Sequence, residues 1–185
     1  MSWILNKILP PCHLLIFSTL LGTELYQTFI MTKVSFRALP KPSFRSLQKR
    51  VFPVYFKTQT VLLFLNVVTL SGLSAATKAD WLPQLVAGIT AVLNLSIYEP
   101  RTRRSMIEVA HQGENYLRRH YLADHLLWMR IEARHDGATT PEMQRLRKQF
   151  SRDHAMCIHL NLVSVGAMMF YGFRLGLRLD FGSVV

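Results

Sequence analysis

Hydrophobic residues in this chain gather in four long runs that are separated by polar connections. The runs cover about residues 9–31, 54–76, 81–98 and 155–177. At about 1.5 Å per helical residue, each run is about long enough to cross a hydrocarbon layer of about 30 Å. The pattern therefore predicts an all-α integral membrane protein with four transmembrane helices, built as a single four-span domain over residues 1–185.

Polar residues and prolines set the expected ends of these helices. Pro53 suits the first position of a helix, where its missing N–H has no intrahelical partner, so the second span is predicted to start near Val54. Glu99 precedes Pro100 and is therefore pushed away from the α region, which predicts a kink or a stop at the end of the third span. Thr140 and Pro141 have the N-cap and first-position pattern of a last helix that continues into the fourth run.

The connection over residues 102–152 contains a further helical pattern. Apolar residues alternate three and four positions apart with one gap, at Met106, Ala110, Gly113, Leu117, Tyr121, Trp128 and Ile131. This spacing predicts an amphipathic helix from Thr102 to about His135 outside the membrane. Its most apolar patch is 126–129. Two placements stay open, on the membrane surface or against the base of the bundle.

Positive charge is concentrated in two of the connections. The segment joining the first two runs contains no acidic residue and seven cations: Lys33, Arg37, Lys41, Arg45, Lys49, Arg50 and Lys57. The other basic connection extends from Arg101 to Arg152. Four crossings place both connections on one side, and short basic connections favour the cytosol. The charge pattern thus predicts a multi-pass protein with both termini non-cytosolic.

Composition agrees with a membrane protein and narrows the partners. Half of the 185 residues are hydrophobic, and the formal net charge is +11. The basic residues border apolar runs without any nucleic-acid-binding motif, which argues against nucleic acid as a partner. The expected partners are the lipid bilayer and its anionic headgroups, which attract cations near the surface by about 1 kcal/mol each.

Several sequence blocks, in order, resemble the transmembrane protein 205-like family, which is described mainly as a domain of unknown function. The motif residues that carry the resemblance are Pro40, Phe44, Gln48, Phe52, Pro53, Tyr55, Phe56, Glu99, Pro100, Arg101, Thr102 and His154. Further matching positions lie in the first span and around Asn94 and Asn161. The resemblance implies a four-span integral membrane protein and supplies no reaction or substrate.

Polar residues inside the predicted spans form the candidate site. The five residues are Glu24, Gln59, Asn94, His159 and Asn161, all predicted within about 5–10 Å of the cytosolic face by the helical rise. Such groups usually face the interior of a bundle. One interpretation is a hydrogen-bonded cluster that holds helices together. The other is proton or cation handling, which requires Glu24 and His159 to meet.

The charged segment after the third run has two interpretations as well. Glu99 and Arg101 are expected either to lock the third span to the basic connection through charge-assisted hydrogen bonds or to leave Arg101 available for lipid phosphate. In the second interpretation, Arg101, Arg103 and Arg104 act with Lys49 and Arg50.

No cofactor, metal site or catalytic motif is expected. His13 and His159 are predicted to be about 20 Å apart by the helical rise, which argues against a haem between them. The pattern therefore favours a non-enzymatic membrane anchor or adaptor that acts through its basic cytosolic face, with a protein partner on residues 102–152. The alternative is small-solute, ion or proton transport through a polar cavity, for which a bundle of this size needs to form a homo-oligomer.

Overall fold

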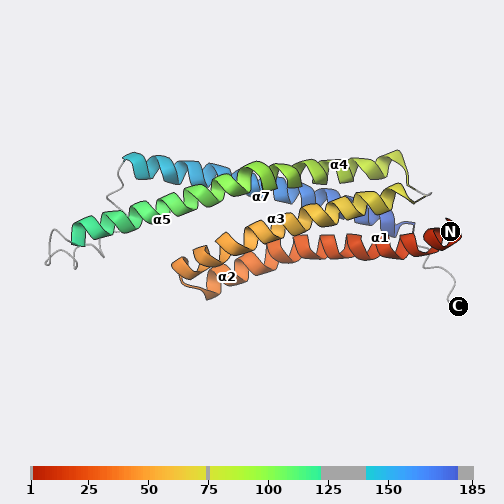
Figure 1. Ribbon diagram of the computed structural model, residues 1–185, viewed down its shortest axis with the longest axis horizontal. Coiled ribbons are helices and arrows are strands. Elements are labelled where there is room, and N and C mark those ends of the chain that lie inside the picture. Colours follow the sequence, from red (N-terminus) through yellow and green to blue (C-terminus); the bar gives the residue numbers. More distant parts are fainter. Residues whose placement is uncertain (1, 74–75, 122–140, 179–185) are drawn as a thin grey trace. The chain divides into compact units, whose positions relative to one another are not determined.

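The computed structural model describes residues 2–73, 76–121 and 141–178, and over these residues the protein is helical without strands (Figure 1). The elements are α1 (Ser2–Leu25), η1 (Tyr26–Met31), α2 (Thr32–Ala38), α3 (Lys41–Ser71), α4 (Lys78–Leu93), η2 (Asn94–Tyr98), α5 (Glu99–Tyr121) and α7 (Pro141–Gly176). The two η elements are π-helical turns that continue the α-helices beside them.

Four stretches of continuous helix are long and apolar enough to cross a membrane. They cover Lys7–Ala38, Lys41–Ser71, Lys78–Gln112 and Pro141–Gly176. The first and third predicted apolar runs lie inside the first and third stretches, whereas the second run extends beyond the end of α3 and the fourth extends one residue beyond α7. The all-α, four-helix prediction is confirmed.

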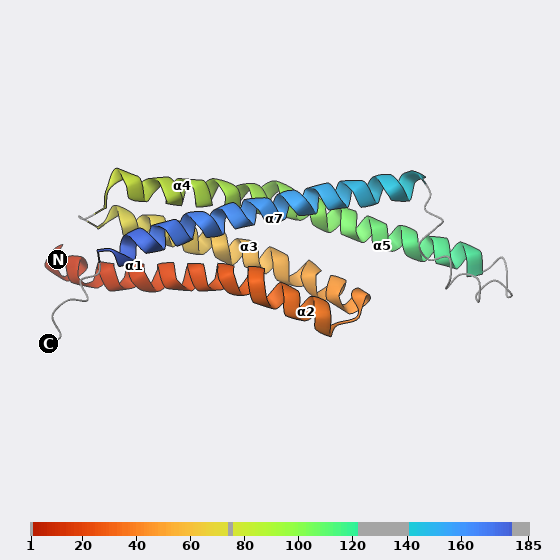
Figure 2. The same cartoon turned by 180° about the vertical axis from the view of Figure 1, so that it is seen from behind.

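The chain separates into two compact units. One contains Met1–Ser96 and Ile158–Val185, and the other contains Ile97–Cys157. The first unit is a bundle of α1, η1, α2, α3, α4 and the second half of α7. In this bundle the start of α1, the connection from α3 to α4 and the end of α7 lie at one end, and the turn between α2 and α3 lies at the other (Figure 2).

Each helix of the bundle buries one seam whose residues are spaced alternately three and four apart. The seam residues are His13, Phe17, Leu20 and Glu24 on α1; Phe56, Gln59, Leu63, Asn66 and Leu70 on α3; Asp80, Gln84, Ala87 and Ala91 on α4; and Asn161, Ser164, Met168 and Tyr171 on α7. This spacing keeps one face of a helix against nearly parallel neighbours. The apolar seam residues form the hydrophobic core, and the polar seam residues occupy equally buried positions along the same helix faces.

One expectation about proline is wrong, and the helix stop that was one alternative of a second expectation is not found. Helix α3 starts at Lys41 with Pro42 in its first turn, so Pro53 lies inside the helix. The Glu99–Pro100 step ends no helix, because the π turn of η2 changes the hydrogen-bonding register immediately before the residue that lacks an N–H. Pro141 does begin α7, as predicted, and α7 runs without a break into the fourth apolar run.

Only the beginning of the predicted amphipathic connection is described. Helix α5 covers its first part, to Tyr121. The remainder of that predicted helix, the apolar patch at 126–129 and the proposed N-cap Thr140 lie outside the described residues.

Candidate functional site

Glu24 is the centre of the candidate site. Its side chain is fully buried on the seam of α1. Gln59 on α3 donates from Nε2 to Glu24 Oε1 at 2.7 Å, and the Ser164 hydroxyl on α7 donates to the same oxygen at 2.8 Å. Gln59 Nε2 also donates to Ser164 Oγ at 3.1 Å. Three helices are therefore joined through one carboxyl oxygen.

The second carboxyl oxygen of Glu24 and the amide oxygen of Gln59 have no hydrogen-bond partner among the described residues. Glu24 Oε2 and Gln59 Oε1 are both buried, and neither contacts a donor. Glu24 Oε2 shares the carboxyl carbon with Oε1, and Gln59 Oε1 shares the amide carbon with Nε2, so both lie beside the Gln59–Glu24 hydrogen bond. A buried acceptor without a donor is costly in an apolar environment, so this pair of groups is incompletely satisfied.

Asn161 forms a second polar contact toward the α2 end of the bundle. The Tyr55 hydroxyl donates to Asn161 Oδ1 at 2.6 Å, and Asn161 Nδ2 donates to Thr28 Oγ1 at 2.7 Å. Thr28 and the buried Gln27 lie in the π turn η1, which begins two residues after Glu24. Turns of this kind are frequent at functional sites.

Of the five predicted intramembrane residues, the structure joins two directly and separates one from them. Glu24 and Gln59 are in direct contact, Asn161 lies one helical turn from Ser164, and Asn94 is buried in η2. His159 has an exposed side chain, whereas Glu24 has none of its surface exposed. A Glu24–His159 pair, which the transport interpretation required, is therefore not formed.

A third polar contact lies between the Glu24 layer and the end of the bundle. Asn66 on α3 donates from Nδ2 to Gln84 Oε1 on α4 at 3.0 Å. Both side chains are almost fully buried. Leu20, Leu63 and Met168 are buried nearby on the same seams, so apolar and polar residues alternate along the bundle.

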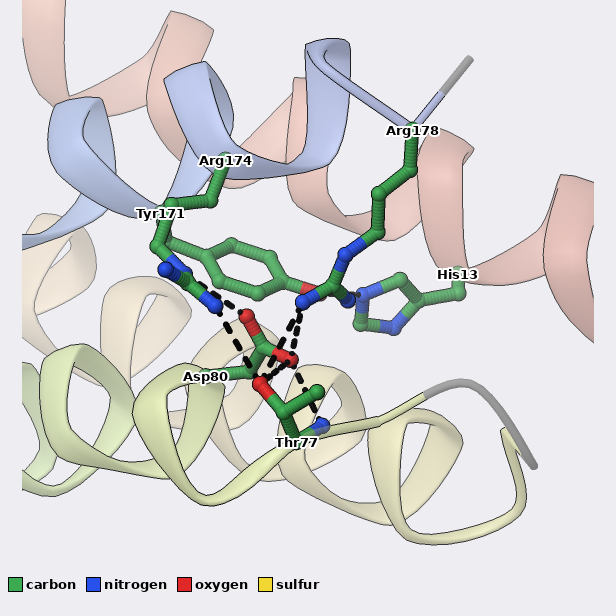
Figure 3. A network of polar contacts seen from close by, with 6 residues as sticks. All are labelled: His13, Thr77, Asp80, Tyr171, Arg174 and Arg178. Carbon is green, nitrogen blue, oxygen red and sulfur yellow. Dashed lines mark hydrogen bonds and ion pairs between the residues drawn. The ribbon is translucent and has the colours of Figure 1, made fainter. Parts of the chain in front are cut away.

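Sequence reasoning missed a charged network at the end where α1 starts (Figure 3). Asp80 is fully buried, and its two oxygens contact Arg174 Nε at 3.0 Å and an Arg178 Nη at 2.6 Å. The Thr77 backbone N–H donates to the same carboxylate at 2.7 Å, completing a capping box at the start of α4. Both arginines also reach the Thr77 hydroxyl.

His13 lies beside this network with both ring nitrogens engaged. Nδ1 is 2.7 Å from Thr69 Oγ1, and Nε2 is 2.5 Å from the Tyr171 hydroxyl. The Thr69 hydroxyl already donates to the Leu65 carbonyl, so the arrangement that satisfies every group has Nδ1–H donating to Thr69 and Tyr171 donating to Nε2. Figure 3 shows the Tyr171 ring beside both arginine side chains, with its hydroxyl toward His13.

The α3 residues on which the predicted family resemblance rests pack within the same bundle. Gln48 is buried and donates to Ser35 Oγ at 3.4 Å, and Phe44 meets Phe36 edge to face. Phe52 stacks on Phe56, while Pro40 occupies the N-cap position of the helix without a side-chain hydrogen bond. The motif thus fixes the α2–α3 turn and its approach to Asn161 through Tyr55.

The Glu99 segment differs from its predicted arrangement. Glu99 pairs with Arg103 one turn along α5, with Nε 3.2 Å from Oε1, whereas Arg101 is exposed. A pair four residues apart on one helix explains why Arg101 is not the partner. Thr102 is half-buried next to this pair, and His154 stacks on Phe150 within α7.

A family model described as a domain of unknown function, DUF4149, matches residues 15–111. The chain belongs to this family. It is also similar to "Xanthocillin biosynthesis cluster protein D" of Aspergillus fumigatus, with 35% identity over 174 residues that cover 91% of this chain and 90% of the relative. No solved structure matches the chain. The matched region contains all of α2, α3 and α4, and thus most of the buried polar residues of the seams.

Proposed function

We propose that this protein is a membrane anchor whose basic cytosolic face binds anionic lipid headgroups. The observation that carries the proposal is a set of cations, toward the α2–α3 end of the bundle, that form no ion pair in the described part of the chain. Lys33, Arg37, Lys41, Arg45, Arg50 and Lys57 are exposed, and Lys49 is half-buried. We call these seven residues the basic surface.

No carboxylate forms an ion pair with the basic surface within residues 2–73, 76–121 and 141–178. The sequence contains no acidic residue between Glu24 and Asp80. Among the described residues, the ion pairs involve Glu99, Asp153 and Asp80, and none includes a cation of the basic surface. Anionic headgroups are the chemistry that would complement it, at about 1 kcal/mol per cation near the surface.

The opposite end of the bundle supports the proposed orientation. There, Arg174 and Arg178 are both paired with Asp80. The unpaired positive charge is thus concentrated at one end, and the positive-inside rule favours that end in the cytosol. Both termini are then non-cytosolic, because the start of α1 and the end of α7 share the other end.

The name of one similar protein suggests a process in which the anchor takes part. The similar Aspergillus protein is named for a biosynthesis cluster. We extend this to an adaptor role in which residues 102–152 hold a protein partner at the membrane. The resemblance to the transmembrane protein 205-like family is compatible with this role.

The basic surface is testable by lipid binding in nanodiscs or liposomes. Wild type is expected to prefer phosphatidylserine-containing bilayers over phosphatidylcholine bilayers. This preference should fall by at least 10-fold in the triple variant Arg37→Gln, Lys41→Gln, Arg45→Gln, because each charge contributes about 1 kcal/mol. Lys78→Gln, which removes an exposed cation at the other end, is the matched control and should change little. Equal binding of wild type to both lipids would refute the proposal.

A second candidate is proton or small-solute passage that does not involve His159, and the buried polar seam around Glu24 favours it. Reconstitution with a pH-sensitive dye separates the two candidates. Proton flux that is abolished by Glu24→Gln and kept after deletion of residues 110–147 would support passage. Membrane recruitment of a partner that is lost on the same deletion would support the anchor.

A further inference from the structure

The polar group at the centre of the bundle is chemically unusual because it contains a carboxyl without a cation. From the described residues, Glu24 receives hydrogen bonds only from an amide and a hydroxyl, and both reach the same oxygen, Oε1. No described lysine or arginine forms an ion pair with it. An isolated buried carboxylate costs far more than a neutral buried acid.

The unpartnered atoms indicate what is missing. Glu24 Oε2 and Gln59 Oε1 are both oxygens, so an ionised Glu24 leaves two acceptors and no donor. A proton on Oε2 turns that oxygen into a donor, and Gln59 Oε1 is an acceptor that still lacks one. A carboxylic acid and a primary amide are complementary in this way, each giving one donor and one acceptor.

We propose that Glu24 is a proton-binding site, and that its carboxylic acid pairs with the Gln59 amide while Ser164 donates to Oε1. The proton comes from water: an O–H bond forms at Oε2 as a hydronium ion becomes water, and release reverses the step. This site is independent of the basic surface and of the anchor role.

A proton fits the site better than a metal cation does. Hard cations take about six or more oxygen ligands. The site offers two unpartnered oxygens, and no group of three acidic, histidine or cysteine side chains able to hold a metal occurs among the described residues. One proton supplies the donor that the two oxygens lack, whereas a metal ion bound there would lack most of its ligands.

Other titratable groups on the packed helices are directed elsewhere. On α3, Lys57 is exposed and the Tyr55 hydroxyl donates to Asn161. On α7, His159 is exposed. The nearest titratable side chain on η1 is Tyr26, which is exposed, and on the described part of α1 it is His13, about 16 Å away by the helical rise. Glu24 is thus the group on which a proton would reside.

Infrared difference spectroscopy on the full-length protein in nanodiscs tests the protonation directly. The wild-type minus Glu24→Gln spectrum at neutral pH is expected to contain a carboxylic-acid C=O band that shifts in D₂O. The wild-type minus Asp80→Asn spectrum is the matched control, because Asp80 is equally buried but paired with two arginines. Beside the amide bands of the new asparagine, it should contain carboxylate bands and no carboxylic-acid C=O band. Carboxylate bands in the Glu24 difference spectrum would overturn the proposal.

Two further arms keep the result decisive. If Glu24→Gln fails to fold, Gln59→Met retains the acid, and its band should move to higher wavenumber because Oε1 loses a donor. An unchanged spectrum in that variant would contradict the acid–amide pair. Replacing N-methylglucamine chloride by sodium chloride should leave the acid band unaltered, and conversion to carboxylate bands by sodium would overturn the proton in favour of a metal cation.

Discussion

Glu24 and Asp80 are both fully buried carboxyl side chains in the same bundle, but they are stabilised in opposite ways. Asp80 has charged partners on both oxygens, from Arg174 and Arg178. Glu24 has neutral donors on one oxygen and no partner on the other. Burial alone therefore does not determine the state of a carboxyl group in this bundle, because the partners decide whether a charge is retained.

The position of each residue explains this difference. Asp80 lies in the first turn of α4, where the end of α7 brings two arginines whose side chains remain about one-third exposed, at 29% and 32%. Those long side chains reach the carboxylate while staying in contact with water. Glu24 lies about 16 Å further along α1 than His13, among apolar seam residues. A guanidinium there would have to be desolvated fully.

The largest expected effect comes from removing the charge of Asp80. Asp80→Asn leaves two arginines without their carboxylate and weakens the capping box with Thr77, so we expect a loss of about 3 kcal/mol in the free energy of unfolding. Equilibrium unfolding in detergent micelles measures it. Lys78→Gln is the control on the same turn. A change below about 1 kcal/mol would show that the Asp80 network does not stabilise the bundle.

An intermediate effect is expected when the Glu24 side chain is truncated. Glu24→Ala removes the acceptor used by Gln59 and Ser164 and opens a small cavity, which should cost about 1.5 kcal/mol in the same unfolding assay. Thr23→Ala, at the half-buried neighbouring position, is the matched control. If Glu24→Ala stabilised the protein, Glu24 would be a buried, destabilising carboxylate and not a hydrogen-bonded acid.

The smallest expected effect is that of Glu24→Gln. The new amide keeps an oxygen for Gln59 and Ser164 and offers an N–H to Gln59 Oε1, as the protonated acid does, so the free energy of unfolding should change by less than about 0.5 kcal/mol. The contrast with Asp80→Asn, the same chemical substitution, is the sharpest form of the comparison. Comparable losses in both variants would remove the proposed distinction.

Counting residues along the helices grouped two residues that the structure places in contact. It placed Glu24, Gln59 and Asn161 at similar depth, and the structure joins the first two and sets Asn161 one turn away. The same counting failed for His159, because depth says nothing about the direction around a helix. His159 is two residues from Asn161, which is about 200° of rotation, and it therefore leaves the buried seam.

The Asp80 network was missed although one local signal was present. Thr77 and Asp80 have the spacing of a capping box, which predicts the start of α4 at Lys78. Nothing local indicates that Arg174, 94 residues later, completes it. The alternating spacing of three and four, traced along all four helices, would have identified the polar seam positions as buried.

The sequence by itself determined the class of this protein: four apolar runs of membrane length and a basic surface without acidic residues. These are properties of segments, and length, hydropathy and charge express them directly. Only the tertiary structure decided which polar groups meet, that Asp80 holds two arginines and that Glu24 holds none. Partner choice depends on how each helix is rotated and on contacts between residues about 35 to 140 positions apart, and these follow from packing the whole bundle.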